Sequence, residues 1–263
     1  MNKFFFIFLI IMLLIKTGNV FSADNIFNVD NIYVDTKKNK KREELFDNAV
    51  AEAFAKLTKR ILIQEDREKT LKTPLYEIKR LVSHYEFIED NESINNKKVK
   101  FNITFDNVQI NNYFYKKNIL YSDISKLKLI LMPILLDDNK IFLFSENYFY
   151  DNWQLENKES GYIDYILPLE NIEDIELINK NKKNLELINI DFLNKYDLNN
   201  YIYLIINYKK NSTDVFLKSF ISENKDIKNI SIDHVNNDKL ENYKNIKTIL
   251  KNYINELWKS HNL

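Results

Sequence analysis

The chain has 263 residues, of which 45% are hydrophobic, with 38 basic and 38 acidic residues and no cysteine. The lack of cysteine excludes disulfides, thiol catalysis, zinc sites built on thiolates and a lipid-anchored N-terminal cysteine. The even charge balance gives no indication of nucleic-acid binding, and the length is sufficient for one or two domains that are stable without covalent links.

The first residues have the pattern of a secretory signal peptide. Lys3 precedes an unbroken apolar run at residues 4–15, and small residues occupy the positions that a signal peptidase selects. A helix over this run would rise only about 18 Å, too little for a hydrocarbon core of about 30 Å. We therefore predict a signal peptide at residues 1–22, cleavage between Ser22 and Ala23, and a periplasmic protein without a transmembrane span. A lysine directly after the run is unusual for a signal peptide, so the alternative is that the segment is retained as a membrane anchor.

Residues 27–34 predict a strand with a bulge, because their apolar alternation slips at Asp30 and Asn31. Asp35 and Thr36 are expected to cap the helix that follows. The apolar residues of that helix recur at three- and four-residue steps, which predicts an amphipathic helix lying across a sheet. These residues are Phe46, Ala49, Val50, Ala53, Phe54, Leu57 and Ile61.

The next segment predicts a short helix and a hairpin. Pro74 suits the first turn of the helix, and the hairpin strands are expected at residues 85–88 and 99–105. The second of these strands alternates strictly between apolar and polar residues, so one face should be buried and the other wet. Asp106 should then cap a short helix that carries Val108, Tyr113 and Phe114.

The second half of the chain opens with a nearly continuous apolar run at residues 127–136, which is typical of a strand covered on both faces. Asp137 and Asp138 begin the turn after it. Further strands are predicted at residues 141–144, 162–167, 201–208, 215–221 and 230–232, and helices near residues 147–155, 172–178, 190–196 and 240–258.

These elements predict an α/β (α+β) fold of two domains, each a sheet packed by helices, the second ending in a long helix. We place the N-terminal domain at residues 23–118 and the C-terminal domain at residues 127–263. Residues 116–126 between them have no sustained apolar period.

The motif inventory predicts no catalytic, cofactor-binding or metal-binding residues. Phosphate-binding loops, dinucleotide fingerprints and nucleophile elbows need several glycines, and Gly161 is the only glycine after the predicted leader. His84, His234 and His261 lack the spacing of metal ligands. We expect His84 to be half-buried beside a strand, with a catalytic role as the less favoured alternative.

Two groups of residues allow a functional interpretation beside a structural one. The first is acidic: Glu170, Glu173, Asp174 and Glu176. These acids stand at a predicted helix start, so they are better explained by the helix dipole than by a calcium or catalytic site. The second is aromatic: Tyr148, Phe149, Tyr150 and Trp153. This group could stack on a sugar, but the four-residue spacing of Phe149 and Trp153 favours core packing.

Several soft motifs are distributed over most of the chain. They include Tyr33-Val34-Asp35, Ser83-His84-Tyr85-Glu86-Phe87, the strand with Pro133, Leu167-Pro168-Leu169 and Tyr201-Ile202-Tyr203-Leu204. In these motifs the chain resembles the bacterial exported proteins of domain of unknown function family 2066. The resemblance implies export in a Gram-negative bacterium and no established activity. Members tend to carry an acid three residues after the proline, where this chain has Asn171.

We therefore expect a periplasmic envelope accessory or assembly factor that acts by binding another envelope protein, without a cofactor and without enzymatic activity. Two alternatives remain open at this point: an envelope hydrolase that uses Glu or Asp with His84, and a structural surface protein.

Overall fold

The computed structural model describes residues 26–36, 41–88, 98–122, 127–154, 163–188, 193, 195–196 and 198–263. The predicted signal peptide, Gly161 and most of the helix expected at residues 190–196 lie outside these ranges. The chain divides into two compact units between Leu120 and Tyr121. Each unit is a sheet packed by helices, and the second ends in a long helix, so the predicted fold class is confirmed.

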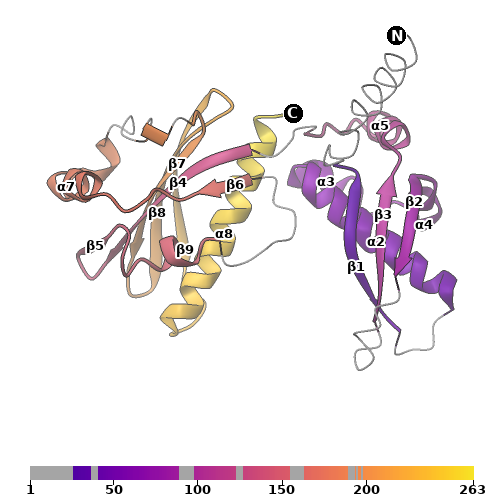
Figure 1. Cartoon of the computed structure of the whole chain (residues 1–263), viewed down its shortest axis with the longest axis horizontal. Coiled ribbons are helices and arrows are strands. Elements are labelled where there is room, and N and C mark those ends of the chain that lie inside the picture. The colour runs from indigo at the N-terminus through magenta and orange to yellow at the C-terminus, as the bar shows by residue number, and fades with distance from the viewer. Residues whose placement is uncertain are drawn as a thin grey trace, which may run out of the picture. The chain divides into compact units, whose positions relative to one another are not determined.

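The N-terminal unit is a three-stranded antiparallel sheet of order β1-β3-β2 with helices on one face (Figure 1). Its elements are β1 (Asn28–Asp35), α2 (Arg42–Ile61), α3 (Gln64–Glu68), α4 (Leu75–Arg80), β2 (Val82–Ile88), β3 (Lys98–Phe105) and α5 (Asn107–Lys116). The order agrees with the predicted one except for α3, a single polar turn whose sequence has no apolar period.

The long helix α2 covers the sheet with the face that its sequence predicts. Phe54 and Leu57 are buried, and Ala49 and Ala53 are fully buried in the middle of the apolar stripe. Because alanine is small, β1 and β3 can approach the helix backbone closely here. Phe46 is only half-buried, and Leu45 is buried in its place.

The bulge in β1 is confirmed, but the predicted cap of α2 is wrong. The register with β3 shifts between Val29 and Ile32, and Asn31 takes a φ of 59°. Helix α2 begins only at Arg42, so its N-cap position is Lys41 and not Asp35 or Thr36, and the Lys41 side chain makes no capping hydrogen bond.

The cap of α5 is as predicted, because Asp106 accepts a hydrogen bond from the N–H of Gln109 at 3.0 Å. Val108, however, is exposed and not inward-facing. The buried side of the helix is formed by Tyr113 and Phe114, as predicted, together with Ile110.

The C-terminal unit is a six-stranded mixed sheet with helices on both faces (Figure 1). Its elements are β4 (Leu127–Asp137), β5 (Lys140–Phe142), α6 (Tyr148–Asn152), β6 (Ile163–Ile166), α7 (Ile172–Lys180), the 3-10 turn η2 (Leu185–Leu187), β7 (Tyr201–Tyr208), β8 (Ser212–Ile221), β9 (Asn224–Asp233) and α8 (Lys239–Ser260). The strands β4 and β7 are parallel neighbours in its centre.

Strand β4 separates two hydrophobic cores, which explains its continuous apolar run. Leu129 and Leu131 point into the core formed with α6 and α8, whereas Ile130 and Met132 point into the core formed with α7. Strand β9 is longer than the predicted residues 230–232. It lies at the edge of the sheet and is mostly exposed, so few of its residues are apolar and the hydrophobic pattern marks only part of the strand.

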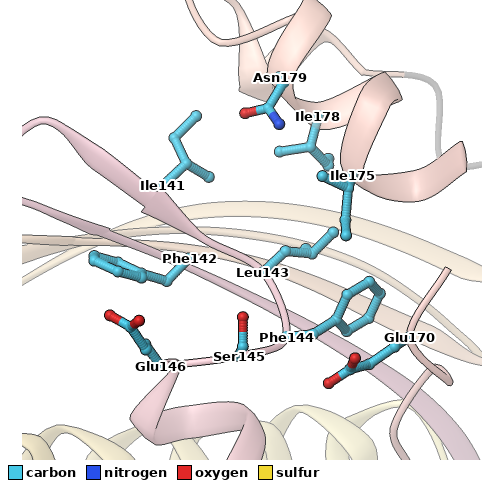
Figure 2. Close-up of a pocket in the computed structure, with 10 residues that line it drawn as sticks. All are labelled: Ile141, Phe142, Leu143, Phe144, Ser145, Glu146, Glu170, Ile175, Ile178 and Asn179. Carbon is cyan, nitrogen blue, oxygen red and sulfur yellow. The ribbon is translucent and has the colours of Figure 1, made fainter. Parts of the chain in front are cut away.

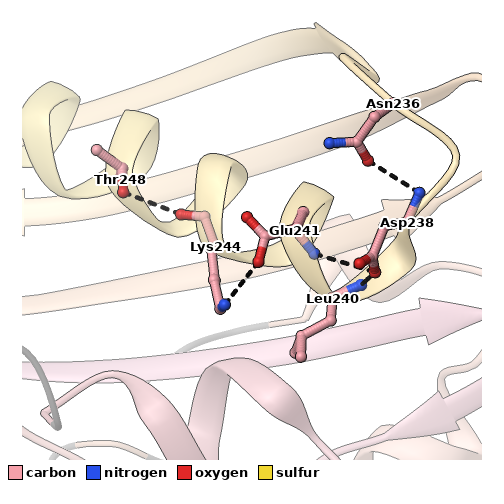
Figure 3. Close-up of polar contacts among 6 residues, drawn as sticks. All are labelled: Asn236, Asp238, Leu240, Glu241, Lys244 and Thr248. Atoms are coloured by element: carbon pink, nitrogen blue, oxygen red, sulfur yellow. Dashed lines mark hydrogen bonds and ion pairs between the residues drawn. The ribbon is translucent and has the colours of Figure 1, made fainter.

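Helix α8 begins with a well-formed cap (Figure 3). Asp238 accepts hydrogen bonds from the N–H groups of Leu240 at 2.9 Å and Glu241 at 3.4 Å, and its own N–H donates to Asn236. Lys244 pairs with Glu241 at 2.6 Å on the polar side of the helix. Neither α8 nor any other helix in the described part of the chain has the length and apolar character needed to cross a bilayer.

Candidate functional site

The clearest irregularity in the C-terminal sheet is a gap along one edge of β4. Strand β6 pairs with β4 in parallel as far as Ile130, and β5 pairs with it in antiparallel from Leu135 onward. On this side, residues 131–134 between them have no strand partner. Backbone groups in such a gap need other hydrogen-bond partners, because unpaired buried carbonyls are costly.

Asn147 supplies one such partner, for the carbonyl of Pro133. Its side chain is fully buried, and Nδ2 lies within hydrogen-bond distance of the carbonyl oxygens of Pro133 (2.9 Å), Phe142 (3.0 Å) and Leu143 (2.9 Å). Its Oδ1 accepts from the N–H of Phe149 at 3.1 Å and so caps α6. The side-chain amide of Asn147 therefore links the gap in β4, the chain after β5 and the start of α6 through hydrogen bonds.

A cleft with a volume of about 170 Å³ lies beside this gap (Figure 2). Its lining comes from β5, the turn after β5, the loop that follows β6, and α7. The cleft therefore lies beyond the carboxyl end of the parallel strand β6, which is where α/β sheets commonly bind ligands. The lining residues are Ile141, Phe142, Leu143, Phe144, Ser145, Glu146, Glu170, Ile175, Ile178 and Asn179.

The cleft has an apolar floor and a rim with two carboxylates. Leu143, Phe144 and Ile178 are buried and belong to the core beneath. Glu146 and Glu170 are exposed at the rim, and Figure 2 shows Ser145 between them. Glu146 takes a φ of 57° in the turn after β5. Among the described residues, no lysine or arginine forms an ion pair with either glutamate.

The loop that carries Glu170 is held at both ends. The hydroxyl of Tyr150 donates to the carbonyl oxygen of Pro168 at 2.7 Å, and Asn171 caps α7 by accepting from the N–H of Glu173 at 2.8 Å. Burial and the nearby negative charge of Glu170 raise the pKa of Tyr150, so this tyrosine stays a neutral donor. Glu170 is therefore presented from a fixed loop.

The acidic group predicted from the sequence is not one site. Glu173 and Asp174 stand in the first turn of α7, as the dipole interpretation requires. Asp174 is buried and pairs with Lys195, whose Nζ lies 2.8 and 2.6 Å from its two oxygens, while Glu170 lies at the cleft and Glu176 is exposed. Within the described ranges, no three His, Asp or Glu residues come close enough to hold a metal ion.

The histidines lie in separate places. His84 is exposed on the open face of β2 opposite Thr104, so the prediction that it is half-buried is wrong: helices cover only the other face of this sheet. His234 stacks on Tyr208 with ring centroids 4.5 Å apart. His261 lies 3.0 Å from Asp226 near the C-terminus. Each histidine therefore has its own local surroundings, and His234 and His261 have different partners within the C-terminal unit.

The aromatic group of α6 packs in the core, as the spacing predicts. Phe149 and Trp153 are fully buried, whereas Tyr148 stacks on Tyr243 and Tyr150 contacts Phe144 on the other side of the sheet. The four rings do not form a common stacking surface.

The two turn aspartates differ in their roles. Asp138 takes a φ of 48° in the two-residue turn between β4 and β5, as a tight hairpin requires. Asp137 has a second role that the sequence did not indicate: it accepts a hydrogen bond from the hydroxyl of Tyr243 at 3.0 Å and pairs with Lys239 at the start of α8.

Comparison with protein-family models, curated protein sequences and solved structures finds no match. The family resemblance therefore stays a prediction that rests on the sequence motifs. The sequence analysis assigned no site residues: it attributed Glu170 to the start of a helix and did not single out Ser145, Glu146 or Asn147. Nothing in the local pattern distinguishes these three polar residues from an ordinary surface turn.

Proposed function

We propose that the protein is a periplasmic envelope accessory or assembly factor that acts by binding another envelope protein at this cleft. The observation that carries the proposal is the cleft itself: a depression with an apolar floor beside the sheet gap, with two carboxylates at its rim that have no ion-pair partner among the described residues.

The size of the cleft favours a protein partner over a cofactor. Sites for small molecules commonly measure about 300–1,000 Å³ and enclose most of the ligand. At 170 Å³ the cleft is smaller and suits the side chains of a partner chain. Its carboxylates would repel the phosphates of a nucleotide or nucleic acid.

The geometry supports binding more than hydrolysis. A hydrolase that used a carboxylate with His84 would need both groups within hydrogen-bond reach of one substrate. His84 is exposed on the open face of β2 opposite Thr104, and in the described part of the chain no hydrogen bond or ion pair joins it to a carboxylate. The carboxylates at the cleft suit recognition of charge.

Site-directed photo-crosslinking in the native cell envelope tests the proposal. A photoreactive residue at Ile175, in the cleft wall, should capture one defined envelope protein that mass spectrometry identifies. The same residue at Ile227, which is 63% exposed on β9, serves as the control and should not capture it. Equal capture at both positions, or no adduct at Ile175, would contradict the proposed function.

A further inference from the structure

An apolar strip continues from the cleft wall onto the surface. Leu169, Ile172 and Ile175 are 77%, 74% and 40% exposed, and they recur at intervals of three residues. Ile178, the next residue at this interval, is buried in the floor of the cleft. Ile172, Ile175 and Ile178 form a row at three-residue steps on α7, and Leu169 lies in the loop directly before the helix, so apolar side chains continue from solvent into the cleft. We name Leu169, Ile172 and Ile175 the α7 strip.

The α7 strip is bordered by negative charge. Glu170, Glu173 and Glu176 are exposed beside it, and Glu146 stands at the rim of the cleft. Asp174 does not contribute, because Lys195 neutralises it. In the described ranges these four glutamates form no ion pair.

The charge along α7 is asymmetric. The exposed glutamates lie toward the beginning of the helix, whereas Lys180 and Lys182 lie at its end, where Lys182 donates to the carbonyl oxygen of Asn139 at 3.0 Å. A ligand on the α7 strip would therefore experience a negative field at one end and a positive field at the other. Such a field sets the direction in which a charged segment binds.

We infer that the partner segment is a basic amphipathic helix that packs aliphatic side chains on the α7 strip, inserts one of them into the cleft and places its lysines or arginines beside Glu170 and Glu173. This inference rests on the proposed function and adds the chemistry of the partner. A ridge of aliphatic residues at helical spacing is the surface against which an amphipathic helix packs.

Other occupants fit less well. In an antiparallel symmetric dimer formed through this surface, the four glutamates of one copy would meet only Lys180 and Lys182 of the other, so the interface would keep an excess of negative charge. An anionic lipid surface or a nucleic acid would meet the same repulsion. The exposed aliphatic residues need an apolar partner, and the glutamates need a cationic one, which a basic amphipathic segment provides in one chain.

Two labelled peptides test the inference by fluorescence anisotropy with the full chain. Both carry leucine at helical spacing, and their remaining positions carry lysine in one peptide and glutamate in the other. We expect the lysine peptide to bind about tenfold more tightly at low salt and to lose this advantage as salt screens the charges.

A charge-reversed variant identifies the residues responsible. Glu170→Lys combined with Glu173→Lys should invert the preference between the peptides. The matched control is Glu65→Lys combined with Glu68→Lys, which reverses two exposed acids at the same spacing on α3 and should leave the preference unchanged. Ile175→Asp should weaken both peptides, and circular dichroism should show that each variant remains folded.

The outcomes separate the inference from the proposed function. Equal binding of the two peptides, or an unchanged preference in the charge-reversed variant, would overturn the inferred chemistry. If neither peptide binds but Ile175 still crosslinks to an envelope protein, the inference is wrong and the proposed function stands. If the lysine peptide binds selectively but no crosslink forms in the envelope, the cleft has the inferred selectivity and the proposed function is wrong.

Discussion

The two sheets of this protein bury their central strands in different ways. In β3 of the N-terminal unit, Phe101, Ile103 and Phe105 are buried and the residues between them are half-buried on the opposite face. In β4 of the C-terminal unit every residue from 129 to 135 is buried. The difference follows from the layers: helices pack on one face of the first sheet and on both faces of the second.

This comparison explains where the candidate site lies. A sheet with one open face has polar side chains on that face. A sheet covered on both faces can bind a ligand only at its ends and edges. The cleft accordingly lies at the irregular edge of β4, between β5 and the loop after β6.

The largest effect is expected from limited proteolysis, which should separate the two units. Limited trypsin treatment should cut first at Lys116, Lys117 or Lys126 and leave two folded fragments, because the chain divides close to these residues. Lys126 lies outside the described residues. A first cut near Lys97 or Lys98, or fragments that are both unfolded by circular dichroism, would show that the units are one cooperative domain and that the comparison between them fails.

A charged side chain on either face of strand β4 should destabilise the C-terminal unit. Leu131→Asp and Met132→Asp, which point into different cores, should each destabilise the C-terminal unit by several kcal/mol. That loss is comparable with the whole stability of a small domain, about 5–15 kcal/mol. Denaturant unfolding of each variant measures the loss of unfolding free energy. A near-normal midpoint for one of the pair would mean that one face of β4 is wet, as in β3.

The N-terminal unit should be equally sensitive beneath its covered face. Leu57→Asp places a carboxylate at a fully buried position of α2, so we expect several kcal/mol of destabilisation in this unit. Thermal unfolding should show a large fall in the melting temperature of the N-terminal unit while the C-terminal transition persists. A shift of only a degree or two would mean that the helix faces the other way.

Asn147→Ala should reduce the stability of the C-terminal unit by about 2–4 kcal/mol, because it leaves buried carbonyls unpaired and removes the cap of α6. Asn147→Asp keeps the capping oxygen but loses the amide donor, so most of the loss should remain. Asn152→Ala on the same helix is the control, since within the described residues its side chain donates a single hydrogen bond, to the carbonyl oxygen of Tyr148 at 2.9 Å. Equal losses at both positions would contradict the role given to Asn147.

The smallest effect is expected on the open face of β3. Thr104→Asp should change the unfolding free energy by no more than about 0.5 kcal/mol, whereas Ile103→Asp on the next residue should be strongly destabilising. Urea unfolding of the pair measures the contrast between the two faces. A large loss for Thr104→Asp would show that this face is covered.

The sequence by itself determined which faces are buried. Strict alternation at residues 99–105 indicates one covered face, and the unbroken apolar run at residues 127–136 indicates two, because the side chains of a strand alternate between its faces. The same reasoning predicts the stripe of α2 around Leu57 and the buried side of α8. Elements with few apolar residues, such as α3 and most of β9, lack this signal and were missed or shortened.

Only the tertiary structure decided the site. The cleft forms where three segments meet beside the gap in β4: the end of the pairing between β4 and β6, the turn after β5, and the loop after β6. These segments are far apart along the chain. Asn147, Glu146 and Glu170 gain their roles from that meeting, since a hydrogen bond or a shared rim depends on distance in space. Hydrophobic periodicity records only whether a residue is buried, so it could predict the two cores but could not place the polar residues at the edge between them.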